Sequence, residues 1–253
     1  MRGVTKYVMS FLFCGTVLLP DVRAEHGFKK NKFDSKKYNN HSIVVRQTKP
    51  HVDHIGGSLP AEEVVKKEAE RFFEALDQLP ASFIRRSGLK YVTFLNNLTL
   101  HNVPAGGIAR GDSIYLAVNF SDKTVYHELF HIFDPHEKDR KWTRLNDKKF
   151  VYTGSAFYSE KVSSVKRKRK AKNLQEGTFD DDFVSRYAMS NEREDRAETF
   201  SFMVSEKQGF LRRTAKSPVL RKKMEFIVRI TSKHNLLGSR FWQDIFENDS
   251  STQ

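Results

Sequence analysis

The chain has 253 residues, of which 30% are charged and 38% hydrophobic, so it can bury the core of one domain or of two small ones. No apolar run reaches the roughly 18–20 residues that a membrane-spanning helix needs, and the single cysteine, Cys14, excludes a disulfide within the chain. The net charge of +13 favours acidic surfaces, polyanions or anionic lipids as partners, but it does not define the fold.

The N-terminus has the pattern of a secretory signal peptide. Two basic residues precede an apolar run at residues 7–19, and small or apolar residues lead up to Ala24. We predict cleavage between Ala24 and Glu25 and a secreted or periplasmic protein, whose net charge falls to about +11 because residues 1–24 carry three basic side chains and one acidic one. The alternative is an N-terminal core helix. A lipoprotein anchored through Cys14 is disfavoured by the bulky residue before it.

The segment that follows, residues 25–57, is polar and lysine-rich without a clear hydrophobic period, which predicts a flexible basic arm. A single domain at residues 58–250 comes next. It opens with a predicted helix that has Ser58 as N-cap and stops at Pro80. The β-branched and aromatic stretches that follow predict two strands separated by a glycine-rich turn; the strands are residues 89–95 and 113–118, and the turn is residues 103–112.

The second half of the domain is predicted to be mainly helical. An apolar helix begins at Ser121 or Asp122 and ends at Pro135, and a loop-like segment that contains the basic run Lys166–Lys170 follows it. Further helices are predicted at residues 191–204 and 217–234, with a short aromatic segment near the C-terminus. Strands in the first half and helices in the second indicate an α+β fold.

The apolar helix carries an HExxH motif formed by His127, Glu128 and His131. Four residues make just over one helical turn, so the two imidazoles lie on the same face and converge on one point. Glu128 is rotated by about 100° from His127, which places its carboxylate beside a metal ion rather than on it. This pattern is typical of a zinc site with a general base. The alternative is an ordinary amphipathic helix.

A catalytic zinc ion needs a third protein ligand and an open position for water. Asp134 lies on the right helix face, but it is about 10 Å along the axis from His127. Glu137 stands where metzincin-type sites place a third ligand, yet Asp134 occupies the position of their turn glycine. Glu194 and Glu198 share a face of a predicted helix, so one could bind the metal while the other hydrogen-bonds a ligating histidine. Spacing alone does not decide between them, and a solvated charged stretch is the alternative.

Two stretches together, "TVYHELFH" at residues 124–131 and "YAMSNEREDRAETF" at residues 187–200, resemble the catalytic domain of anthrax lethal factor and its relatives, which include the bacterial Pro-Pro endopeptidases. The resemblance implies a gluzincin-type, zincin-like fold with a small mixed sheet, an active-site helix and a C-terminal helical part. It further implies one zinc ion per chain, with His127, His131 and Glu194 as ligands and Glu128 as the general base.

The same resemblance assigns roles to other residues. Tyr187 would hydrogen-bond the oxyanion that develops at the scissile carbonyl, and Glu198 would hydrogen-bond a ligating histidine. An edge strand that contains Ile114, Tyr115 and Leu116 would align an extended peptide substrate. The chain departs from the family pattern where two arginines, Arg193 and Arg196, flank the third ligand. Substrate preference is therefore open.

We accordingly expect a secreted, monomeric zinc endopeptidase that hydrolyses peptide bonds in peptides or proteins through a zinc-activated water. The alternative is a secreted protein that is catalytically inactive or not an enzyme and that binds polyanions or membrane surfaces through its basic side chains. Lys166–Lys170 is the candidate surface for such binding, although a run of charges is more often a solvated loop. The complete set of motif residues argues against a degenerate protease.

Overall fold

The computed structural model describes residues 42–50, 52, 54–134, 141–154, 179–233 and 236–247. Its central sheet has the strand order β1 (Val44–Val45), β3 (Tyr91–Leu100), β6 (Ser113–Ala117) and β5 (Gly107–Arg110). The first three of these strands are parallel, whereas β5 runs antiparallel to β6. Two short strands, β2 (Ile55–Ser58) and β4 (Val103–Pro104), pair antiparallel with the C-terminal half of β3. The predicted α+β class with a small mixed sheet is confirmed.

β5 is the edge strand of this sheet within the described residues, and β6 is internal. The prediction that Ile114, Tyr115 and Leu116 form an edge strand is therefore wrong, because β6 pairs with β3 on one side and with β5 on the other.

The predicted glycine-rich turn at residues 103–112 is in fact mostly strand. A tight turn at Gly111, whose φ is +61°, folds residues 107–110 back onto β6.

The end of the predicted basic arm also belongs to the sheet. β1 and β2 both fall within residues 25–57, so the prediction of a loose arm is wrong for the described part. The reason is two apolar residues that are buried in a mostly polar sequence: Ile43, which begins the short apolar run at residues 43–45, and Ile55. Ser58 is the last residue of β2 rather than a helix cap, and the first helix, α1 (Glu62–Asp77), begins after Ala61.

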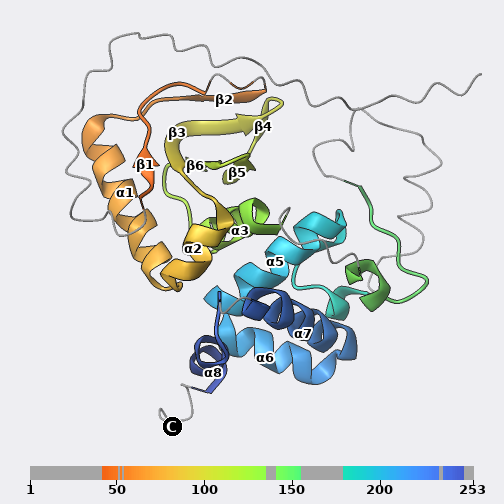
Figure 1. The fold of residues 1–253 in the computed structure, drawn as a ribbon. Helices are drawn as coiled ribbons and strands as arrows, with labels where there is room; N and C mark the ends of the chain where they lie inside the picture. Colours follow the sequence, from red (N-terminus) through yellow and green to blue (C-terminus); the bar gives the residue numbers. More distant parts are fainter. Residues whose placement is uncertain are drawn as a thin grey trace, which may run out of the picture. The chain divides into compact units, whose positions relative to one another are not determined.

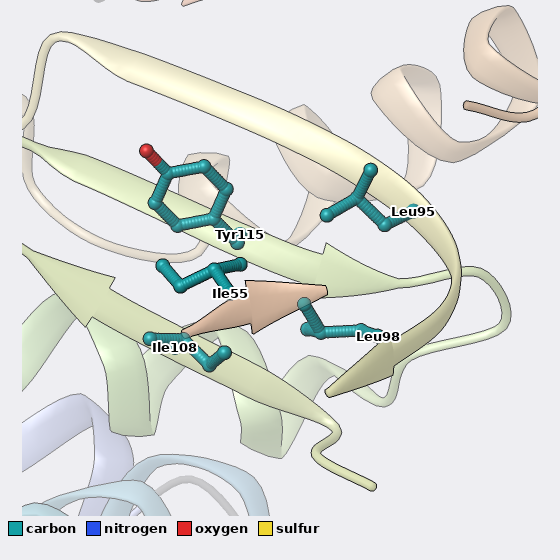
Figure 2. Close-up of a cluster of buried hydrophobic side chains, with 5 residues drawn as sticks. All are labelled: Ile55, Leu95, Leu98, Ile108 and Tyr115. Atoms are coloured by element: carbon teal, nitrogen blue, oxygen red, sulfur yellow. The ribbon is translucent and has the colours of Figure 1, made fainter. Parts of the chain in front are cut away.

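One face of the sheet carries a small hydrophobic cluster of its own. Figure 2 shows Ile55 of β2 lying over the sheet among side chains from β3, β5 and β6; the buried members are Ile55, Leu95, Leu98, Ile108 and Tyr115. Leu95 and Leu98 are three positions apart on β3, so a regular strand would point them to opposite faces. An irregularity around Asn97, whose φ is +52°, brings both to this face. The cluster fixes the edge strand β5 to the sheet through Ile108.

The opposite face packs against helices (Figure 1). α1 and α3 (Asp122–Phe133) lie against the sheet, and α2 (Ala81–Ser87) and α5 (Glu192–Ser205) pack on α3. Aromatic side chains join the layers: Phe72 of α1 and Phe94 of β3 have ring centroids 6.2 Å apart, and Phe130 of α3 and Phe200 of α5 stack at 4.8 Å. This aromatic core fixes α3 and α5 against each other.

The C-terminal part contains α6 (Lys207–Lys216), α7 (Pro218–Ser232) and α8 (Ser239–Glu247), together with three short 3-10 turns, η4 (Trp142–Leu145), η5 (Asp180–Asp182) and η6 (Tyr187–Met189). Ser217 caps α7 and Pro218 is its first residue, as predicted. None of the helices in the described ranges is long and apolar enough to cross a membrane. The predicted signal peptide, Glu137 and Lys166–Lys170 lie outside the described residues.

Candidate metal centre

The HExxH motif lies in the middle of α3. The Ser121 side chain caps this helix by accepting a hydrogen bond from the backbone N–H of Thr124 at 3.3 Å. The apolar positions around the motif bury the helix between the sheet and α5, and His127 and His131 lie on its remaining polar face with ring centroids 4.6 Å apart. The two imidazoles therefore project to the same side, as the four-residue spacing predicts.

Glu194 meets these two histidines from the first turn of α5. The helix begins at the N-cap Asn191, whose side chain accepts hydrogen bonds from the backbone N–H groups of Arg193 and Glu194. Glu194 Oε2 lies 3.1 Å from His127 Nε2 and 3.0 Å from His131 Nε2. One carboxylate oxygen thus faces both imidazole nitrogens across an interface between helices far apart in the sequence.

The donor set of this cluster fits a zinc ion. His127, His131 and Glu194 each offer one ligand atom, and these atoms lie within 4.8 Å of one another. Ligands at about 2.0–2.1 Å from a tetrahedral zinc ion are about 3.3 Å apart, which is close to the two nitrogen–oxygen distances observed here. Two nitrogens and one carboxylate oxygen leave a fourth position open, as in a catalytic rather than a structural site.

The electrostatics of the cluster favour a positive charge between the helices. Burial alone would lower the pKa of His127, but hydrogen bonds with Glu194 and Glu198 outweigh burial and raise that pKa to about 10. Burial likewise opposes ionisation of Glu194, yet the two histidines hold the pKa of its carboxyl group well below the usual range. A divalent cation would supply the positive charge that these carboxylates favour.

Glu198 lies one turn along α5 and contacts the other ring nitrogen of His127. Its Oε1 is 2.9 Å from His127 Nδ1, and its Oε2 accepts a hydrogen bond of 2.6 Å from the Ser185 hydroxyl. Ser185 in turn accepts a hydrogen bond of 3.1 Å from the backbone N–H of Ala188 in η6. Glu194 and Glu198, which spacing could not distinguish, therefore face opposite nitrogens of the same imidazole.

Glu128 points from α3 toward the edge strand β5. Burial raises the pKa of Glu128 above its usual range, although the two histidines and the backbone N–H of Ala109 act in the opposite direction. A Cβ added at Gly107 would lie 2.6 Å from Glu128 Cγ, so only glycine lets β5 approach α3 this closely. Gly107 is a residue of the site that the sequence interpretation missed.

Tyr187 lies on the 3-10 turn η6, immediately before α5. Its ring centroid is 5.9 Å from that of His127. Burial raises the pKa of the Tyr187 hydroxyl well above its usual range, and the carboxylates of Glu194 and Glu128 raise it further. The hydroxyl therefore stays protonated at neutral pH and can act as a hydrogen-bond donor beside the metal cluster.

A comparison with known families gives this geometry a context. Residues 95–243 match the model of a family described as "Putative zinc-binding metallo-peptidase", and the match covers more than half of the chain. The chain belongs to this family. No curated protein and no solved structure matches the chain. The match extends from β3 to α8 of the metallopeptidase and includes every residue of the metal centre described above. Because the family is one of peptidases, peptides are the expected class of substrate.

An ion pair connects the two ligand-bearing helices of the metallopeptidase. Asp134, directly after α3, is only 4% exposed, and its Oδ2 lies 2.9 Å from the guanidinium of Arg196 on α5. Asp134 is absent from the metal cluster, in agreement with its rejection as a ligand. Burial raises the pKa of the Asp134 carboxyl group and Arg196 opposes this rise. The pair fixes the end of α3 to the first turns of α5.

A second buried network is formed by Asp195, which is rotated by about 100° from Glu194 around α5. Asp195, next to Glu194 in sequence, lies 2.9 Å from the ammonium group of Lys223 on α7. It also accepts hydrogen bonds from the Trp142 indole at 2.9 Å and from the Tyr152 hydroxyl at 2.8 Å. Asp195 and Lys223 are both 0% exposed. This network anchors α5 to α7 and to the segment around η4.

The sequence contained a signal for this network that the interpretation did not use. Lys223 occupies a position in the apolar stripe of α7, whose other buried members are Leu220, Phe226, Ile227 and Ile230. A lysine at a core position of an amphipathic helix needs a buried anionic partner. The partner, Asp195, could not be identified from sequence because "NEREDR" contains three acidic residues, Glu192, Glu194 and Asp195, within four positions.

Proposed function

We propose that this metallopeptidase is an exported, zinc-dependent endopeptidase of the lethal-factor type, in which His127, His131 and Glu194 hold one zinc ion. The observation that carries the proposal is the position of Glu194 Oε2, at 3.1 and 3.0 Å from the Nε2 atoms of the two motif histidines. The family match supports zinc and peptide chemistry, and the two motifs that resemble lethal factor support the assignment of individual roles.

Glu198 and Glu128 have different proton roles in this proposal: Glu198 holds a proton on His127, and Glu128 transfers one between water and the leaving amine. Glu198 Oε1 lies 2.9 Å from His127 Nδ1 and would hold a proton on that nitrogen, which leaves Nε2 of the same ring free to bind the ion. A zinc ion held by these residues would lower the pKa of a bound water molecule and polarise the scissile carbonyl. Glu128, whose pKa is raised by burial, takes a proton from the attacking water on its carboxylate and returns it to the leaving amine.

Tyr187 lines both cavities beside His127 and Glu128. Its hydroxyl remains protonated because its pKa is raised, and it can donate a hydrogen bond to the oxygen of the scissile carbonyl as negative charge develops there. The carboxylates of Glu194 and Glu128 contribute to this raised pKa, so the hydroxyl lies in the field of both groups.

β5 takes the aligning role that the sequence interpretation gave to β6. Among the described residues β5 pairs only with β6, so its outer edge offers backbone groups to an extended peptide. Its residues Gly107 to Arg110 line a cavity that also contains Glu128, His131 and Glu194. A peptide paired with this edge would carry its backbone past the metal centre.

Zinc content and hydrolysis, measured on matched variants, test the proposal. Purified mature protein should contain about one zinc ion per chain, and His131→Ala should lose it. Glu128→Gln should keep the zinc but lose chelator-sensitive peptide hydrolysis by at least about a hundredfold. Glu225→Gln, an exposed change on α7, should alter neither property. Wild-type protein that binds no zinc, or full activity in Glu128→Gln, would contradict the proposed site.

Export can be tested separately from catalysis. Expression of the full chain in a secreting bacterial host, followed by N-terminal sequencing, should yield a mature protein that starts at Glu25. Recovery of the protein only inside the cells with Met1 retained would argue against the signal peptide, and it would leave the zinc site unaffected.

A further inference from the structure

Two cavities meet at the metal centre. A cavity of about 490 Å³ follows β5 toward Arg110 and reaches Arg193 on α5. A smaller cavity of about 230 Å³ lies at the other end of β5, beside Lys123. Both are lined by Gly107, His127, Glu128 and Tyr187, so the reacting groups stand where the two cavities join. A peptide that follows β5 would occupy one cavity on each side of the scissile bond.

The larger cavity is also lined by basic side chains that are not part of the metal centre. Apart from the metal centre's own residues, the ionisable side chains that line it are His101, Arg110 and Arg193. Arg110 and Arg193 are exposed, and neither guanidinium forms a salt bridge or hydrogen bond with another residue that the structure describes. Lys123 in the smaller cavity differs, because its ammonium group lies 3.1 Å from Glu206.

The two arginines that flank Glu194 in sequence therefore have different roles. Arg196 is 11% exposed and pairs with Asp134 in the protein interior. Arg193 of α5 lines the larger cavity together with Arg110 of β5, and the helix and the strand that carry them are separate elements of the fold. Two unpaired guanidinium groups on separate elements thus approach the same substrate channel, and a guanidinium fork is well suited to binding a carboxylate.

We propose that this channel selects peptides with an aspartate or glutamate side chain about three residues before the scissile bond, bound by Arg110 and Arg193. Arg110 is three residues along β5 from Gly107, which is about 10 Å at 3.3 Å per residue. A substrate strand antiparallel to β5, the more stable arrangement, places residues on the N-terminal side of the scissile bond beside Arg110. This inference rests on the proposed peptidase function and adds its substrate class.

Cleavage profiling with charge-reversed variants tests the inference. Wild-type protein digesting a proteome-derived peptide library should enrich acidic residues two to three positions before the cleaved bond. The double variant Arg110→Glu/Arg193→Glu should lose this enrichment and favour lysine or arginine there. Arg212→Glu/Arg240→Glu, which changes the net charge equally on exposed positions of α6 and α8, should keep the wild-type profile. No acidic enrichment, or identical profiles for both double variants, would overturn the inference.

A binding measurement separates this inference from the proposed function. Glu128→Gln protein should bind a fluorescein-labelled peptide that contains glutamate more tightly than its glutamine counterpart. Arg110→Gln and Arg193→Gln added singly should each weaken binding of the glutamate peptide by about twofold to fivefold, the range for partly exposed ion pairs. Equal affinity for the two peptides would overturn the inference. Absence of zinc and of all cleavage in wild-type protein would instead contradict the peptidase function.

Discussion

The metal centre is held from two sides by different means. On the α5 side, three consecutive residues are fixed by charge: Glu194 faces the motif histidines, Asp195 faces Lys223, and Arg196 faces Asp134. On the β5 side, contact depends on shape. Gly107 lets the strand approach Glu128, and Ile108 packs into the cluster on the far face of the sheet.

This difference shows how one site can meet two requirements, which are partners for its buried carboxylates and a fixed position for its proposed general base. Buried carboxylates need cationic partners: on α5, Asp195 has the ammonium group of Lys223, whereas Glu194 and Glu198 both face motif histidines. A general base needs correct distance and burial more than a partner, and close packing provides both. Changes on the α5 side should therefore affect zinc binding and stability, whereas changes on the β5 side should affect hydrolysis.

The largest expected effect is on the α5 side. Lys223→Ala leaves Asp195 buried without its cation and should lower the free energy of unfolding by about 3–5 kcal/mol. Urea denaturation of zinc-free protein measures this, with the exposed neighbour Lys222→Ala as control. A loss below about 1 kcal/mol would show that the network does not anchor α5.

On the β5 side, Gly107→Ala should separate hydrolysis from zinc binding. The new methyl group would lie 2.6 Å from Glu128 Cγ and should displace the base, so kcat should fall by about a hundredfold or more while zinc content stays unchanged. Gly106→Ala is the matched control, because its nearest contact would be an ordinary 3.8 Å. Equal activity of the two variants would show that β5 can move away from α3.

Arg196→Gln changes the α5 side and should have a smaller effect on stability and on zinc binding. Loss of the guanidinium leaves Asp134 buried without its partner, which should cost about 2 kcal/mol of stability. Because the pair aligns the two ligand-bearing helices, the Kd for zinc should rise about tenfold. Competition with a chelator of known affinity measures this, and an unchanged Kd would limit the pair to a structural role.

The smallest expected effect concerns the cluster behind β5. Ile55→Val removes one methylene group and should cost about 1 kcal/mol of stability. Zinc content should not change, since Ile55 lines the larger cavity but is not one of the three residues of the metal cluster. A clear loss of zinc would show that packing in this cluster also affects the positions of the metal ligands on α3 and α5.

Local features of the chain were predictable from sequence, and contacts between distant segments were not. The boundaries of α3 and α5 follow from the capping residues Ser121 and Asn191, and the motif histidines follow from helical periodicity. The internal position of β6 depends on its pairing with β5. The glycines in and around β5 predict a turn instead of a strand, so this pairing could not be predicted. The choice of Glu194 over Glu198 required a family resemblance, because both lie on the same face of α5.

Sequence distance within the metal centre has a consequence for folding. His127 and His131 come together as soon as α3 forms, but Glu194 is 63 residues further along the chain from His131. Closing a loop of this length costs more entropy than forming a helical turn, so docking of α5 on α3 should come late in folding. A newly made or partly unfolded chain would then hold two ligands without the third, and it would be latent as an enzyme until its last helices have docked.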